Sequence, residues 1–186
     1  PGLSPKEREN AITREHGCVF LMQIGDVLKV FLYKDSKDRL IATTNTPKLQ
    51  LEQLAVLEVL EIGKIGAFLD WGLEKDLFLP FKEMTRKVEP GDEILVTLYI
   101  DKSRRLCATM KGIYDLLSKE SPYKEGDTVQ GRVYEFSDNF GTFIAVDDRY
   151  SAMIPRHEDC SFLRIGDIIE ARVTKVKPDG KLDLTM

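Results

Sequence analysis

The chain has 186 residues, of which 42% are hydrophobic and 31% charged, and its formal net charge is −4 at pH 7. This length suits one large domain or two to three small ones, with enough apolar residues for packed cores. No apolar run approaches the roughly 18 residues of a membrane-spanning helix, and the first residues carry no signal-peptide pattern. We therefore expect a cytoplasmic protein without a membrane partner.

The first predicted strand pair begins at a Gly-Asp dipeptide. Residues 25–35 have the pattern of a strand, residues 35–38 that of a polar turn, and residues 39–44 that of a shorter returning strand. Nothing upstream supplies further strands, so residues 1–46 are predicted to be a partial barrel. Residues 3–7 either resemble residues 79–83 or form a capping box that opens a helix.

The second and third predicted units repeat this pattern and add a front half. Gly66-Ala67-Phe68 leads to Leu79-Pro80, and Gly141-Thr142-Phe143 leads to Ile154-Pro155. The glycine lies 14 positions before the proline in both units, and the next Gly-Asp follows 11 positions after it. Each unit then ends in a strand, a polar turn and a short strand. This equal spacing indicates an internal repeat.

Each complete repeat predicts five antiparallel strands in about 60 residues, which is the size of an OB-fold. Gly66 and Gly141 lie inside strand patterns, where we expect a bulge or a sharp bend. Residues 112–119 have the pattern of a short connecting helix. We therefore predict an all-β protein of tandem five-stranded OB-fold barrels with short connecting helices. The second barrel, with its connector helix, is expected at residues 51–118 and the third at residues 122–186.

The potential metal ligands and nucleophiles are sparse. Cys18, Cys107 and Cys160 are far apart and form no C-x-x-C pair, and only His157 lies close to one of them. Two candidate ligands do not make a metal site. We also find no nucleophile–base set and no phosphate-binding loop. The sequence therefore predicts no metal, no cofactor, no small-molecule substrate and no enzymatic activity.

The Gly-x-Phe motif, the later Gly-Asp and the Asp-x3-Arg turn resemble the S-one (S1) RNA-binding domain. The pattern of residues 31–44, followed by a repeat that ends in Leu-Pro and Lys-Glu, is similar to the bacterial conserved virulence factor B family. The resemblance implies tandem S1 domains that bind single-stranded RNA and influence gene expression. Members of that family also carry a C-terminal winged helix, which we expect to be missing from this fragment.

The resemblance implies a site made of two aromatic residues, a His, an Asp and an Arg in each domain. The third repeat keeps the aromatics as Phe140 and Phe143. It has Pro155 and Val176 where the His and the Asp belong, and Lys181 replaces the Arg, with one residue inserted in the turn.

The second repeat keeps Phe68, Asp101 and Arg105, but has Ile65 and Pro80 in place of the first aromatic and the His. The first repeat keeps only the Asp and the Arg of the turn, as Asp35 and Arg39, and its aromatic half is not found in the sequence. No repeat carries the complete set, so binding is predicted to be shared along the array. With an acidic chain, we expect modest affinity per domain and strong salt dependence.

The RNA-binding residues predicted from this resemblance and from neighbouring basic side chains are Phe68, Lys82, Lys102, Arg104, Arg105, Phe140, Phe143, Arg156, Lys181 and Arg39. Residues three apart on a regular strand face opposite sides, so either Gly141 makes a bulge or one of Phe140 and Phe143 faces the barrel core. The Asp and Arg of each turn are alternatively plain surface ion pairs. The alternative function is a protein–protein interaction scaffold, which the acidic balance favours.

Overall fold

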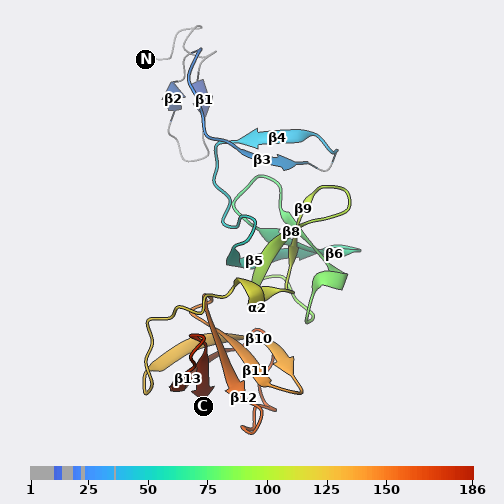
Figure 1. Cartoon of the computed structure of the whole chain (residues 1–186). Coiled ribbons are helices and arrows are strands. Elements are labelled where there is room, and N and C mark those ends of the chain that lie inside the picture. The colour runs from blue at the N-terminus through green and yellow to red at the C-terminus, as the bar shows by residue number, and fades with distance from the viewer. Residues whose placement is uncertain (1–10, 14–18, 22–23, 36) are drawn as a thin grey trace.

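The structure is a computed structural model that describes residues 11–13, 19–21, 24–35 and 37–186 (Figure 1). Within this part, two short strand pairs precede two five-stranded barrels. Strands β1 (Ala11–Thr13) and β2 (Val19–Leu21) are antiparallel. The predicted helix or repeat start at residues 3–7 and the cysteine at position 18 lie outside the described residues.

The second strand pair packs against the next barrel. Strands β3 (Phe31–Lys34) and β4 (Leu40–Thr43) form an antiparallel hairpin. The Phe31 and Tyr33 rings meet the edge of Trp71, with ring centroids 5.8 and 6.0 Å apart. Trp71 is only 3% exposed, and its Nε1 donates a hydrogen bond to the Lys75 carbonyl (2.6 Å). The hairpin therefore extends the core of the second barrel.

The second barrel has the strand order β7-β6-β5-β8-β9, and the outer strands β7 and β9 contact each other. Its elements are β5 (Leu54–Ile62), β6 (Gly66–Asp70), β7 (Leu77–Pro80), the 3-10 turn η1 (Phe81–Glu83), β8 (Glu93–Ile100) and β9 (Leu106–Thr109). Its core contains the fully buried Leu57, Val59, Leu69 and Leu79.

The third barrel is closed, with the order β10-β11-β12-β14-β13, and the parallel contact of β12 with β14 completes it. Its strands are β10 (Thr128–Ser137), β11 (Gly141–Val146), β12 (Tyr150–Pro155), β13 (Ile168–Val176) and β14 (Leu182–Thr185). Alternate residues of β13, such as Ile169, Ala171 and Val173, point into the core. The all-β architecture of tandem OB-fold barrels is confirmed, while the exact domain boundaries stay a prediction.

The bulges lie on the two partner strands, a few residues away from the positions opposite Gly66 and Gly141. Register shifts occur between Val59 and Glu61 on β5 and between Val133 and Glu135 on β10. Gly66 is instead required by close backbone approach, because a Cβ atom there would lie 2.2 Å from the Leu79 carbonyl oxygen. Gly141 faces the Ile154 carbonyl in the same way. Of the two expected alternatives, the bulge does not fall at either glycine, and the bend at the glycines stays a prediction.

The second and third barrels share an apolar interface around the connector. Helix α2 (Ile113–Leu116) is shorter than the predicted helix and packs with Leu95 and Tyr134. The buried Arg132 side chain donates to both carboxylate oxygens of Asp148 (2.8 and 3.3 Å) and to the Glu93 carbonyl of the other barrel (3.3 Å). The buried apolar side chains and the hydrogen bonds of the Arg132 guanidinium together hold the two barrels against each other.

Candidate nucleic-acid interface

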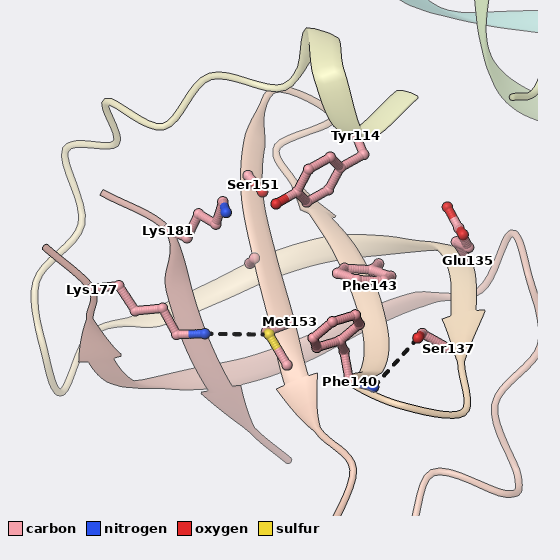
Figure 2. Close-up of a pocket in the computed structure, with 10 residues that line it drawn as sticks. Tyr114, Glu135, Ser137, Phe140, Phe143, Ser151, Met153, Lys177 and Lys181 are labelled. Atoms are coloured by element: carbon pink, nitrogen blue, oxygen red, sulfur yellow. Dashed lines mark hydrogen bonds between the residues drawn. The ribbon is translucent and has the colours of Figure 1, made fainter. Parts of the chain in front are cut away.

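The third barrel carries an open cavity of about 510 Å³ on its outer surface (Figure 2). We call it the third-barrel cavity. It lies over β10, β11 and β12, between the connector helix α2 and the final turn, and is lined by Tyr114, Glu135, Ser137, Phe140, Phe143, Ser151, Ala152, Met153, Lys177 and Lys181. Three of the predicted site residues, Phe140, Phe143 and Lys181, therefore lie together.

The two aromatics of the motif lie on the same outer face. Phe140 is 63% exposed and its ring centroid is 6.5 Å from that of Phe143. Phe143 is half-buried and contacts Tyr134 (6.1 Å) and Tyr114 (5.6 Å). Phe140 precedes strand β11, and Gly141, the first residue of the strand, has φ +126°. Neither Phe140 nor Phe143 belongs to the barrel core, and no bulge at Gly141 is needed.

Two lysines border the same cavity. Lys177 Nζ lies 2.9 Å from Asp183 Oδ1 and 3.4 Å from the Met153 sulfur. Lys181 Nζ lies 2.9 Å from Asp179 Oδ2 and 5.1 Å from the centre of the Tyr114 ring. Hydrogen bonds with Tyr114 and Asp179 raise the pKa of Lys181 above its ordinary value. The Lys181 ammonium therefore lies beside an aromatic ring, and the Lys177 ammonium lies beside the Met153 sulfur at the wall of the same cavity.

Lys177, and not Val176, occupies the place of the motif's Asp. Its N–H donates to the Lys181 carbonyl (2.8 Å), as Asp101 does to Arg105 (2.9 Å). The turn has the same length in both barrels. The extra residue lies earlier, as a bulge of β13 between Val173 and Lys175. The prediction of a residue inserted in the turn was therefore wrong.

The second barrel has a corresponding cavity of about 410 Å³. Phe68 lies there beside Phe78, with centroids 5.5 Å apart, while Ile65 stands 70% exposed at the position equivalent to Phe140. Arg105 Nε donates to Asp38 Oδ1 of the preceding hairpin (2.9 Å). This hydrogen bond is the largest cause that lowers the pKa of Asp38. The second cavity thus lacks the first aromatic residue of the motif, and the guanidinium of Arg105 already forms an ion pair.

The remaining predicted residues are dispersed. Arg39 pairs with Asp35 of its own turn, and its Nε donates to Asp35 Oδ2 (2.7 Å). Several hydrogen bonds from this turn, that of the Arg39 side chain being the strongest, hold the pKa of Asp35 at about 2 despite the opposing effect of desolvation. Arg156 borders a separate hollow and Arg104 another. The exposed Lys82 and Lys102 line neither of the two cavities. The structure thus does not gather the ten residues into one site.

Seven of the ten lining residues were absent from the prediction, and three of these contribute a ring, a sulfur atom or a positive charge. Tyr114 comes from the connector helix, Met153 from the strand opposite Phe143, and Lys177 from the final turn. The spacing of four between Lys177 and Lys181 equals that between Asp101 and Arg105, and this signal was available in the sequence. Tyr114 had no such signal, because only the packing of the two barrels brings it to the cavity.

The described residues contain neither a group of metal ligands nor a helix that could span a membrane. Within 11–13, 19–21, 24–35 and 37–186, no group of three His, Cys, Asp or Glu residues is placed to hold a metal ion. In the same residues, no helix is long and apolar enough to cross a membrane.

These barrels, with an aromatic and cationic cavity on one face, define a protein of tandem OB-folds. Residues 21–45 and 53–111 match the S1 domain family. The matched residues cover the first hairpin and the second barrel, and the third barrel repeats the same pattern.

The particular proteins that the chain resembles are the conserved virulence factor B proteins. It is 23% identical over 190 residues to that of Staphylococcus epidermidis, covering 98% of this chain and 62% of the relative. It is 22% identical over 170 residues to that of Staphylococcus aureus, covering 87% of this chain and 56% of the relative. The chain thus spans about three fifths of the length of these curated relatives. The resemblance predicted from the sequence is confirmed.

A solved structure has the same fold. A multidomain protein with nucleic acid binding domains from Streptococcus pneumoniae superimposes with a TM-score of 0.62 and 22% identity, covering 94% of this chain and 67% of that chain. At this level of identity the likeness supports the arrangement of the barrels.

Proposed function

We propose that this chain binds single-stranded RNA at the third-barrel cavity, performs no chemistry on it, and influences gene expression from the cytoplasm through that binding. The observation that carries the proposal is the exposed Phe140 ring, placed beside Phe143 and two lysines. Single-stranded RNA exposes base faces that stack on aromatic side chains, and cations nearby contact its phosphates. The S1 match and the virulence factor B relatives support the same proposal.

The charges of the cavity predict modest affinity. Lys177 and Lys181 are each paired with a carboxylate, so a phosphate group must compete with Asp183 and Asp179. The chain also carries a net charge of −4, which gives no long-range attraction to RNA. Stacking therefore supplies a large share of the binding free energy, and the phosphate contacts make the affinity fall with salt.

Binding of a fluorescent oligo-uridine at low and moderate salt tests the proposal. Stacking on an aromatic residue contributes about 1–3 kcal/mol per base, so Phe140→Ala should weaken binding by about 5- to 150-fold. Lys181→Ala should also weaken it and reduce the salt dependence. Phe162 is a matched control, since it is 62% exposed and lines neither cavity. Absence of binding at low salt, or equal affinities of Phe140→Ala and Phe162→Ala, would contradict the proposal.

A protein-binding role is the second candidate, because the first hairpin exposes apolar side chains. Leu32 and Leu40 of β3 and β4 are exposed, as are Val27 and Val30 just before them. Contiguous exposed apolar residues are typical of protein interaction surfaces. Capture of a partner that resists ribonuclease and is lost in Leu32→Ser with Leu40→Ser would favour this function over the first.

A further inference from the structure

A groove between the second and third barrels gathers positive charge outside the two cavities. It has a volume of about 590 Å³, and we call it the inter-barrel groove. The loop after η1 forms one wall and the turn before β13 forms the other. It is lined by Arg86, Lys87, Phe136, Leu163, Arg164, Ile165, Gly166 and Asp167. Three cations and one carboxylate thus face a single hollow.

The cations of this groove are more available than those of the third-barrel cavity. Asp167 Oδ2 accepts the backbone N–H of Arg164 (2.8 Å) as part of a turn. In the part of the chain that the structure describes, neither Lys87 nor Arg164 forms a side-chain ion pair, and both are exposed. Lys177 and Lys181, by contrast, are both paired. The groove can therefore accept an anionic ligand without first breaking an ion pair of Lys87 or Arg164.

The walls of the groove are held at a fixed separation. Arg86 Nη1 donates to Asp92 Oδ2 of its own barrel (2.7 Å). The guanidinium lies close against Gly166 of the other barrel, where an added Cβ would lie 2.9 Å from Nε and from Nη2. Arg86 Nε is buried and has no hydrogen-bond partner among the described residues. Because both walls are fixed before a ligand arrives, binding there costs little ordering entropy.

A third hollow at the β10–β11 hairpin shares lining residues with both the groove and the third-barrel cavity. This smaller hollow of about 390 Å³, the tip hollow, shares Ser137 with the cavity and shares Phe136 and Leu163 with the groove. Phe136 is 44% exposed, and the exposed Arg156 borders the tip hollow. The carboxylates of Asp138 and Glu158 also line the tip hollow, and that of Glu158 accepts a hydrogen bond from Thr185 Oγ1 (3.0 Å).

We infer that an RNA strand seated on Phe140 continues around the tip of the β10–β11 hairpin into the inter-barrel groove. Phe136 offers a further stacking surface on the way, and Lys87 and Arg164 neutralise phosphates in the groove. This inference rests on the proposed function and extends its site to a surface that exists only where two barrels meet. Affinity therefore depends on the length of the RNA.

Two RNA lengths and one double variant test the inference. The probes are oligo-uridines of about 4 and about 16 nucleotides, the range of site sizes of OB-folds. Lys87→Ala with Arg164→Ala should leave binding of the short probe unchanged and weaken binding of the long one. Loss of two phosphate contacts should also reduce the slope of log K against log salt by about 1.4 for the long probe.

The matched control is Lys124→Ala with Arg172→Ala, which removes the same charge from exposed positions outside these three hollows. It should change neither probe's binding by a comparable amount. If the groove variant binds the long probe with wild-type affinity and salt slope, or if the control variant loses as much, the inference is wrong while the proposed function stands. If the short and long probes both fail to bind the wild type, the proposed function fails as well.

Discussion

Phe140 and Phe143 form one motif in the sequence but have different surroundings in the fold. Phe140 is exposed before β11, whereas Phe143 packs between Tyr114 and Tyr134. Phe140→Ala should leave the free energy of unfolding nearly unchanged. Phe143→Ala removes packed aromatic area and should lower that free energy by about 2 kcal/mol. Urea denaturation of both variants checks this difference, and equal losses would contradict the assigned environments.

The steric role of Gly66 can be tested by comparison with Gly91, a glycine without close neighbours. A methyl group at Gly66 would approach the Leu79 carbonyl oxygen to 2.2 Å, whereas at Gly91 it would meet open space. Gly66→Ala should therefore cost roughly 3 kcal/mol of stability, since β6 and β7 must separate. Gly91 has φ +91°, so Gly91→Ala should cost only about 1 kcal/mol of backbone strain. Thermal or denaturant unfolding should show this order, and the reverse order would contradict the packing.

A pH dependence follows from Arg86 and Asp92. The hydrogen bond from Arg86 holds the pKa of Asp92 below its ordinary value of 3.8. A lowered native pKa stabilises the fold above the unfolded value and ceases to do so as the pH falls through the native value. Below about pH 4, the wild type should therefore lose stability more steeply than Asp92→Asn. Parallel stability curves from urea melts at several pH values would contradict this.

At the level of elements, the fluorescence of Trp71 measures whether the β3–β4 hairpin packs against the second barrel. Trp71 is the only tryptophan of the chain and is buried beneath Phe31 and Tyr33. Tyr33→Ala should expose the indole, shift its emission to the red and increase quenching by acrylamide. Leu40→Ala, on the exposed face of the same hairpin, should change neither signal. Unchanged emission in Tyr33→Ala would mean that the hairpin does not shield Trp71.

The elements also show where prediction from the pattern was limited. The same type of hydrogen bond closes the turns at residues 35–39, 101–105 and 177–181. In each turn, the backbone N–H of the first residue donates to the backbone carbonyl of the last residue, an Arg or a Lys. In the third repeat this turn lies one residue further from the preceding Gly-Asp pair than it does in the second repeat. The additional residue is absorbed by the bulge in β13 and not by the turn. Local spacing across the turn was the better guide.

For the whole molecule, Arg132 joins the barrels and should control their cooperativity. Its buried guanidinium bonds to Asp148 and to the Glu93 carbonyl across the interface. Removing one partner of a buried ion pair costs about 3 kcal/mol or more, so Arg132→Ala should destabilise the third barrel and separate the two unfolding transitions. Arg149→Ala removes an exposed cation over Tyr150 and should cost under about 1 kcal/mol. Calorimetry distinguishes the two variants, and one shared transition in Arg132→Ala would contradict the coupling.

The repeats, the five-stranded barrels and the aromatic motif could be predicted without the structure, because strand periodicity, glycine contacts and turn chemistry act over short distances. The resemblance to S1 domains also predicted that Phe140, Phe143 and Lys181 belong to one site. Three features could be seen only in the tertiary structure. Tyr114 lines the same cavity, Asp38 accepts a hydrogen bond from Arg105, and Arg86, Lys87 and Arg164 line one groove. These contacts join separate repeats, and the orientation of one barrel on the next follows from the packing of the interface and not from any local pattern.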